Sequence, residues 1–148
     1  MSPIDEERSK YFFDSYAIIE IVKRNSNYEV YSDKDAIFTI FNLAEIYYSI
    51  LNSFDEQKAN EIFNAYRDAV VEISDEILKE AVKFRKMNKK KDLSYADCIG
   101  YVYALKNNLK FLTGDKEFIG MKNDTIRIPK PCAHDRRIGK IILDFFFS

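Results

Sequence analysis

The sequence predicts an α/β protein in which helices flank a short parallel sheet of about five strands. Short apolar runs alternate along the chain with segments whose apolar residues recur at helical spacing. Strands that alternate with helices in this way pair in parallel, and helices cover both faces of the sheet. No repeat, low-complexity tract or linker rich in proline, glycine or serine interrupts the pattern. We therefore expect a single domain over all 148 residues.

The first half of the chain contains three predicted strands and three predicted helices. The predicted strands cover residues 11–14, 36–41 and 69–73. The predicted helices cover residues 15–24, 42–52 and 56–68. The second helix is typical of an amphipathic segment, because Leu43, Ile46, Tyr47 and Ile50 recur at helical spacing.

The second half continues the same alternation. Ser74 is predicted to cap a helix that has Asp75 and Glu76 in its first turn and a lysine-rich far end, which suits the helix dipole. The remaining predicted elements are a helix over 95–106, a strand over 111–113, a short helix after Asp115 and a last strand over 125–128. The tail over 129–148 ends in an apolar run, which fits either an added edge strand or a partner-binding segment.

Composition narrows the class of protein. Hydrophobic residues make up 47% and charged residues 32% of the chain, which is the balance of a globular protein. No apolar run approaches the roughly 20 residues that span a bilayer, and the polar N-terminus is unlike a signal peptide, so a cytoplasmic location is expected. Cys98 and Cys132 have no zinc-like spacing, and one histidine, His134, is a poor basis for a Ser-His or Cys-His hydrolase.

Three acidic residues stand alone inside apolar segments. Asp14 is the only charged residue between Lys10 and Glu20. Glu45 and Asp97 are isolated in the same way, within 36–54 and 93–105. These segments should be largely buried, and a buried carboxylate without a partner is costly unless it is protonated, paired with a base or bound to a cation.

Position and chemistry point these acids toward one metal site. Asp14 and a fourth acid, Asp115, both follow predicted strands, and ligands bind at the carboxyl ends of parallel strands. Glu45 and Asp97 lie in the first turns of predicted helices, which brings them near the same edge. Several converging carboxylates raise one another's pKa unless a divalent cation is bound, and oxygen ligands suit Mg²⁺ or Mn²⁺.

A purely structural interpretation also stands for three of the four acids. Residues 94–97 fit a capping box, and both Asp115 and Asp14 fit the N-cap of a helix. Glu45 has no such explanation, because it is a helical glutamate among mostly apolar neighbours. Taken together, the four favour a site.

Four motifs resemble those of the PIN-domain family, especially the VapC-type toxin ribonucleases of bacteria and archaea. They occur in the family's order at residues 12–15 (FFDS), 42–46 (NLAEI), 94–99 (SYADCI) and 111–118 (FLTGDKEF). The resemblance covers about residues 11–128. Two features depart from the family pattern: Tyr16 stands where many relatives have a small residue, and the tail after Pro129 is longer and more apolar.

The resemblance implies a PIN-like three-layer sandwich and a metal-dependent endoribonuclease that cleaves single-stranded RNA, the toxin of a toxin–antitoxin pair. It implies that Asp14, Glu45, Asp97 and Asp115 hold Mg²⁺ or Mn²⁺ and form the catalytic site. Ser15 and Thr113 would hydrogen-bond the ligating carboxylates from behind. Asn42 would do so more weakly, or would instead cap its helix.

The resemblance also implies partners. Residues 79–91 contain seven Lys or Arg and one Glu, so Lys89, Lys90 and Lys91 are candidates for contacts with the RNA backbone, or else form a solvated helix end. Aromatic side chains can stack on bases, although most of these are expected in the core or at a subunit contact: Tyr47, Tyr48, Tyr95, Tyr101 and Tyr103. A cognate antitoxin is a possible partner, and the surplus of apolar residues predicts a homodimer.

Two other functions compete with this one. A catalytically silent PIN-like module would serve as an RNA-binding protein or adaptor, but such relatives usually lack one of the acids. A phosphotransfer or phosphohydrolase domain on a doubly wound sheet would need a P-loop or an Asp-x-Asp signature, and the sequence has neither.

Overall fold

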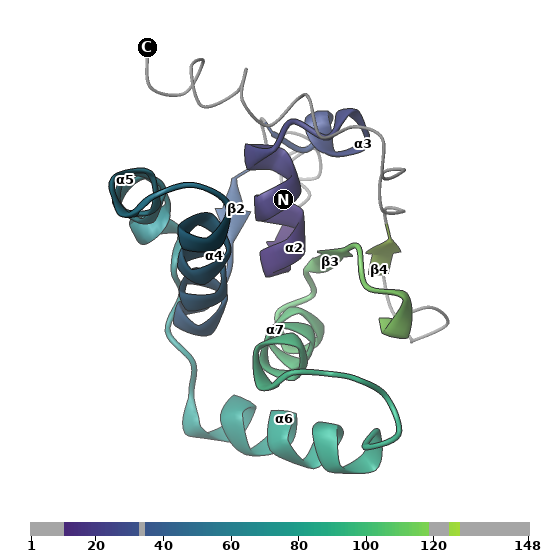
Figure 1. The fold of residues 1–148 in the computed structure, drawn as a ribbon. Helices are drawn as coiled ribbons and strands as arrows, with labels where there is room; N and C mark the ends of the chain where they lie inside the picture. The colour runs from purple at the N-terminus through teal and green to yellow at the C-terminus, as the bar shows by residue number, and fades with distance from the viewer. Residues whose placement is uncertain (1–10, 33–34, 119–124, 128–148) are drawn as a thin grey trace, which may run out of the picture.

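The computed structural model describes residues 11–32, 35–118 and 125–127. It shows helices packed around a parallel sheet, which confirms the predicted α/β class (Figure 1). The strands are β1 (Tyr11–Phe13), β2 (Ala36–Ile37), β3 (Lys110–Thr113) and β4 (Thr125–Arg127). They lie in the order β2-β1-β3-β4, and every neighbouring pair is parallel. The described residues thus form four strands rather than about five.

Within the described residues, six α-helices and two short 3-10 helices accompany the strands. The α-helices are α2 (Ser15–Val22), α3 (Ser26–Glu29), α4 (Ile40–Ser53), α5 (Glu56–Tyr66), α6 (Asp75–Met87) and α7 (Tyr95–Lys106). The 3-10 helices are η1 (Arg67–Ala69) and η2 (Lys116–Phe118). The bounds of α7 agree with the prediction, and Ser74 caps α6 as predicted, since its Oγ accepts a hydrogen bond from the Ile77 N–H at 3.2 Å.

Two consecutive phenylalanines of β1 face opposite sides of the sheet, because side chains alternate along a strand. The Phe12 ring packs against α7, with its centroid 5.8 Å from that of Tyr103. A Cβ added at Gly100 of α7 would lie 2.5 Å from the Phe12 ring, so glycine permits this close approach. Phe13 is also fully buried, and α2 packs against β1 and β3. Helices therefore enclose the two central strands from both faces.

The junction after β2 differs from the prediction. The strand expected over 36–41 ends at Ile37, and α4 begins at Ile40 instead of at Asn42. A capping box explains the earlier start: Thr39 is the N-cap, and Asn42 occupies the third helical position. Asn42 is therefore not the N-cap that the sequence suggested.

The strand expected over 69–73 is absent from the described structure. Residues 67–69 form η1, and only Val70 makes an isolated parallel bridge, which joins it to Phe38. Because β2 ends at Ile37, the residues after Val70 have no neighbouring strand among the described residues with which to pair. This accounts for the sheet of four strands.

Helix α2 ends at Val22, two residues earlier than predicted. Arg24 has a φ of 53°, a left-handed conformation that a helix cannot continue through. Asn25 then caps the short helix α3, which the sequence did not predict, by accepting a hydrogen bond from the Asn27 N–H at 3.0 Å.

Two further predictions concern the C-terminal tail and membrane-spanning segments. The tail over 129–148 lies outside the described residues. Among the described helices, none is long and apolar enough to cross a membrane.

Candidate functional site

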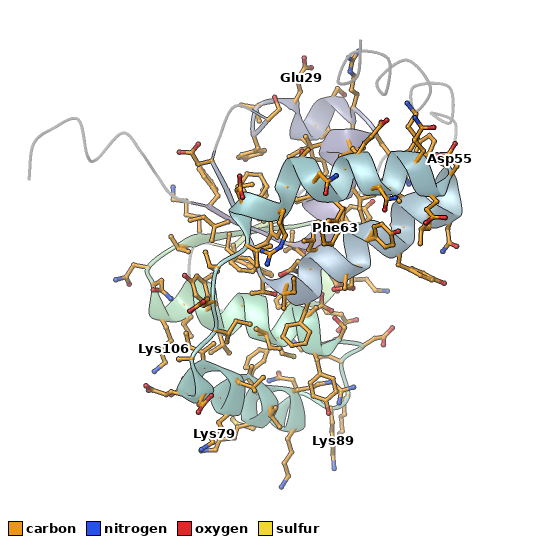
Figure 2. The ribbon with its side chains drawn as sticks, turned by 90° about the vertical axis from the view of Figure 1, so that its left-hand side faces the viewer. Glu29, Asp55, Phe63, Lys79, Lys89 and Lys106 are labelled. Atoms are coloured by element: carbon orange, nitrogen blue, oxygen red, sulfur yellow. The ribbon has the colours of Figure 1, made fainter. Side chains whose placement is uncertain are left out.

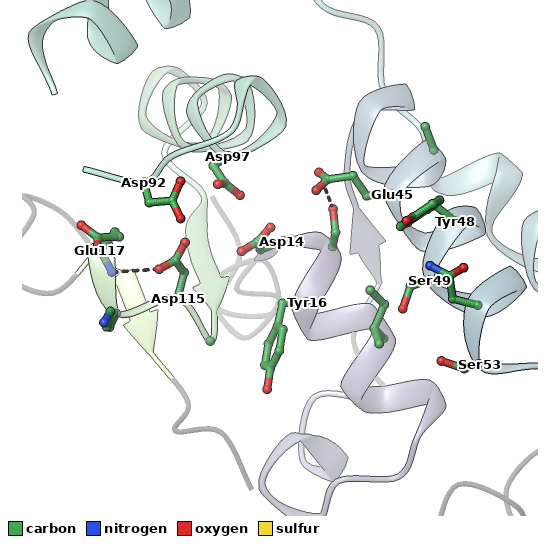
Figure 3. A pocket seen from close by; sticks show the side chains of 16 residues that line it. Asp14, Tyr16, Glu45, Tyr48, Ser49, Ser53, Asp92, Asp97, Asp115 and Glu117 are labelled. Atoms are coloured by element: carbon green, nitrogen blue, oxygen red, sulfur yellow. Dashed lines mark hydrogen bonds between the residues drawn. The ribbon is translucent and has the colours of Figure 1, made fainter. Parts of the chain in front are cut away.

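A cavity of about 1210 Å³ opens beside the carboxyl ends of β1 and β3. Its walls come from α2, α4, the start of α7 and the chain that follows β3 (Figure 3). All four acids singled out from the sequence line it: Asp14, Glu45, Asp97 and Asp115. The structure therefore brings to one place four carboxylates that are spread over about a hundred positions of sequence.

Asp14 is the most deeply placed of the four, with 3% of its surface exposed. It follows β1 directly, and its N–H extends the strand ladder to the Leu112 carbonyl at 2.9 Å. Its side chain makes no cap hydrogen bond to α2. Instead the Thr113 hydroxyl donates to Asp14 Oδ2 at 2.7 Å, from the end of the neighbouring strand. Helix capping therefore does not explain Asp14.

Burial and neighbouring charge change the ionisation of Asp14. Desolvation, followed by the negative charge of Asp97, raises the pKa of Asp14 from 3.8 to about 8. The Thr113 hydrogen bond opposes this shift, and Glu45 adds to it. Asp14 therefore holds a proton near neutral pH unless a cation compensates its charge.

Glu45 is held by a relay of hydrogen bonds from two helices. The Ser15 hydroxyl donates to Glu45 Oε1 at 3.1 Å and accepts from Asn42 Nδ2 at 2.9 Å. Asn42 Oδ1 in turn accepts from the N–H and hydroxyl of Thr39, at 3.0 and 2.8 Å. Glu45 is exposed in the open cavity, so its predicted burial is wrong. Even so, partial desolvation and then the charge of Asp97 raise its pKa.

Asp97 combines a structural role with a place in the cavity. Its Oδ2 accepts the Ser94 N–H at 2.8 Å and its own N–H donates to Ser94 Oγ at 3.1 Å, so the predicted capping box is confirmed. Desolvation raises the pKa of Asp97, the Ser94 hydrogen bonds lower it, and Asp115 raises it again. Its charge also raises the pKa of Asp14 and Glu45. Asp97 therefore caps α7 and also lies close enough to Asp14 and Glu45 to affect their ionisation.

Asp115 is tied to Asp14 through one hydroxyl group. Its N–H donates to Thr113 Oγ1 at 3.0 Å, while the same hydroxyl donates to Asp14. Its Oδ1 accepts the Glu117 N–H at 2.9 Å, which is a local turn as the capping interpretation expected. Thr113 therefore sets the relative position of two of the acids.

Two more acids line the cavity that sequence reasoning missed. They are Asp92 and Glu117, both drawn in Figure 3 beside Asp115. Each follows a lysine in the sequence, so a search for isolated acids passed over them. Lys116 also lines the cavity. Two surface ion pairs of the described structure, Lys58–Glu61 and Lys106–Glu80, lie outside the cavity.

Tyr16, which stands where many relatives have a small residue, forms part of the cavity wall next to the acids. A Cβ added at Gly114 would lie 2.3 Å from the Tyr16 ring and 2.7 Å from the Tyr28 hydroxyl. Glycine is thus required by the close approach of Tyr16. Burial and then the Glu20 carboxylate raise the pKa of Tyr16 to about 12, so it remains neutral.

The cavity offers the kind of oxygen ligands that a hard cation needs, but these side chains are not arranged around a common point. Its acidic side chains offer carboxylate oxygens, the type of ligand that Mg²⁺ and Mn²⁺ prefer. Within the described ranges, no group of three or more His, Cys, Asp or Glu side chains is already arranged to hold a metal ion. The hydrogen bonds described above engage one carboxylate oxygen of each of the four acids. The second oxygen of each carboxylate is a potential ligand.

The lysine-rich segment leads to the rim of the cavity. Helix α6 ends at Met87, so only the lysines and arginine before it complement the helix dipole. Lys89 points away from the body of the protein at the end of α6 (Figure 2). Lys91 Nζ donates to the Glu117 carbonyl at 3.2 Å, and Asp92 follows directly on the cavity wall.

The fold and this cavity define an α/β protein with an acidic site at the carboxyl ends of parallel strands. The family model of the PIN domain matches residues 11–123, and the chain belongs to the PIN-domain family. Proteins of this family are generally nucleases, and they typically use divalent metals.

One similar solved structure is described as a toxin-antitoxin complex from Klebsiella pneumoniae. It superimposes with a TM-score of 0.59 at 18% sequence identity, over 76% of this chain and 92% of that one. This likeness shows a shared fold. A search among curated proteins finds no significant match.

Proposed function

We propose that the protein is a metal-dependent endoribonuclease that cleaves phosphodiester bonds of single-stranded RNA. The observation that carries this proposal is the convergence of Asp14, Glu45, Asp97 and Asp115 on one cavity. Burial and mutual repulsion raise the pKa of three of them, Asp14, Glu45 and Asp97. A divalent cation relieves such repulsion, which is the reason to place Mg²⁺ or Mn²⁺ among these side chains.

The four acids act as ligands, directly or through water. A bound cation supplies a stabilising charge for the phosphate and lowers the pKa of water. Ser15 and Thr113 hold Glu45 and Asp14 in position by the hydrogen bonds described above. Each of these carboxylates keeps one oxygen outside its hydrogen bond, which would be the atom offered to a cation or to its water.

The surroundings of the site fit the same proposal. Lys89, Lys90 and Lys91 precede the cavity rim in the chain and bind the RNA backbone, where phosphate contacts supply most of the affinity. The similar structure is a toxin-antitoxin complex, so we propose a toxin role with a cognate antitoxin as partner, in the cytoplasm.

A homodimer is part of this proposal. Large apolar side chains are exposed on two helices, Ile40 and Phe41 on α4 and Leu78 and Val82 on α6. Exposed apolar side chains of this kind suit a contact between copies. Light scattering at micromolar concentration checks this, and a clean monomer contradicts it.

The test of the nuclease uses Asp97→Asn. The wild type is expected to cleave single-stranded RNA with Mg²⁺ or Mn²⁺ and to be inactive in a chelator. Asparagine retains an acceptor for the Ser94 N–H but removes one negative charge from the site. Cleavage should therefore fall by roughly two to three orders of magnitude, in the range lost when a charge-stabilising group is removed from an active site, while the melting temperature does not fall.

Ser94→Ala is the matched control, because it breaks the same capping box from its other side. It should lower stability by about 1 kcal/mol and leave cleavage nearly intact. If Asp97→Asn stays fully active, or if Ser94→Ala is equally inactive, Asp97 serves only its helix. An RNA-binding wild type that never cleaves would point to the silent adaptor instead.

A further inference from the structure

The cavity is much larger than an ion site, and its two ends differ in charge. Its volume of about 1210 Å³ exceeds the roughly 300–1,000 Å³ of ordinary small-molecule sites. The acids and Lys116 gather at one end. The wall formed by α4 beyond Glu45 carries no charge and consists of Tyr48, Ser49, Asn52 and Ser53. Binding of one or two cations by the acids would therefore leave the uncharged part of the cavity unfilled.

Helical geometry explains why these residues form one wall. They follow Glu45 at intervals of three, four, seven and eight positions, which is the spacing of a single helix face. Figure 3 shows Glu45, Tyr48 and Ser49 in sequence along α4 on the side of the cavity. From Glu45 to Ser53 the helix rises about 12 Å. The wall therefore starts at the acidic end and runs away from it.

Tyr48 is the aromatic side chain of this wall, and it is 68% exposed. Tyr47 on the same helix is used internally, since its hydroxyl donates to Asn60 at 3.0 Å and its ring packs on Phe63. Within residues 11–32, 35–118 and 125–127, the Tyr48 side chain makes no ring contact and no hydrogen bond. Most of the Tyr48 side chain is therefore open to the cavity and to solvent.

Other tyrosines do not offer the same surface. Tyr101 is buried at 5% exposure, and Tyr103 packs on Phe12. Tyr95 is 52% exposed, but the Arg85 guanidinium covers its ring at 4.3 Å, and it does not line the cavity. Among the five tyrosines considered for base stacking, Tyr48 is the one that is both exposed and in the cavity wall.

We propose that the α4 wall is a base-binding subsite, in which Tyr48 stacks on a base of single-stranded nucleic acid next to the bound phosphate. This rests on the proposed nuclease function for the position of that phosphate. Ser49, Asn52 and Ser53 supply hydrogen-bond donors and acceptors for base edges. An uncharged aromatic wall suits the bases, because every base has a face that stacks on an aromatic ring.

The experiment measures binding separately from cleavage. The probe is a single-stranded RNA oligonucleotide with one 2-aminopurine, placed at each position in turn, and the protein is the full chain carrying Asp97→Asn with Mg²⁺. The chain has no tryptophan, so the probe's fluorescence is read without interference. In one position, stacking on Tyr48 should quench the fluorescence.

Tyr48→Ser should abolish this quenching and weaken binding by about 5- to 160-fold, as loss of one base–aromatic stack does. Tyr48→Phe keeps the ring and should behave like the parent. Tyr95→Ser is the matched control, an exposed tyrosine outside the cavity, and should leave affinity unchanged. An abasic nucleotide at the quenched position should weaken binding to the parent but not to Tyr48→Ser.

Several outcomes overturn the proposal. The proposal fails if Tyr48→Ser binds and quenches like the parent, or if the parent does not bind the oligonucleotide with Mg²⁺. If Tyr48→Ser changes the molecular mass in light scattering but not the affinity for RNA, Tyr48 belongs to a protein contact instead. A wild type that binds and quenches without cleaving leaves the base subsite standing and refutes the proposed nuclease.

Discussion

Replacing Asp14 by asparagine is expected to stabilise the metal-free protein at neutral pH. Burial and then the charge of Asp97 raise the folded-state pKa of Asp14 from 3.8 to about 8. The folded state therefore prefers the protonated acid. The stability that this preference contributes is complete below pH 3.8 and is lost as the pH rises toward 8. For this group alone the loss amounts to about 4 kcal/mol at pH 7.

Asparagine has the size of aspartic acid, stays neutral and accepts the Thr113 hydrogen bond through its amide oxygen. We therefore expect the free energy of unfolding of the wild type to fall between about pH 4 and about pH 8, and that of Asp14→Asn to fall less. The difference at pH 7 should reach up to roughly 4 kcal/mol in favour of the variant. Added Mg²⁺ should stabilise the wild type more than the variant, because binding to the folded state adds stability according to affinity.

The assay is urea unfolding followed by circular dichroism, in a chelator, at several pH values. Glu72→Gln is the matched control, since it removes a carboxylate charge from an exposed loop outside the cavity. Its curve should run parallel to that of the wild type. If the Asp14→Asn curve does so as well, the ionisation of Asp14 does not limit stability, and the electrostatic description of the cavity is wrong.

The remaining predictions concern the packing that holds the acids. Thr113→Val removes a donor to Asp14 and an acceptor for the Asp115 N–H, so it should cost roughly 1–3 kcal/mol in urea unfolding, whereas Thr113→Ser keeps the hydroxyl and should cost less. Gly114→Ala places a methyl group 2.3 Å from the Tyr16 ring and should cost about 1–3 kcal/mol. Adding Tyr16→Ala should recover part of that loss in a double-mutant cycle, and strictly additive losses would exclude the contact.

Local chemistry made several features predictable from the sequence. Ser74 and the box from Ser94 to Asp97 were recognisable as helix starts, because capping depends on residues only two or three positions apart. The isolated acids were also recognisable, because an unpaired carboxylate in an apolar segment is costly to bury. The order of strands and helices followed from hydrophobic periodicity, and it predicted the parallel α/β class.

Boundaries were less predictable, because they depend on pairing partners. The apolar run over 69–73 has the composition of a strand, yet only Val70 finds a partner, in Phe38. The strand expected over 36–41 ends early because the capping box at Thr39 starts α4 inside it. Short apolar runs thus predict that a strand can form but not how much of it pairs.

The sequence by itself determined which carboxylates stood alone in apolar segments and which followed strands. Only the tertiary structure decided that Asp14 is buried while Glu45 is exposed, because burial depends on which elements pack over each position. It also decided that Asp92 and Glu117 join the cavity and that one hydroxyl, on Thr113, connects Asp14 with Asp115. Contacts of this kind join residues up to 99 positions apart, and no local pattern of residues encodes them.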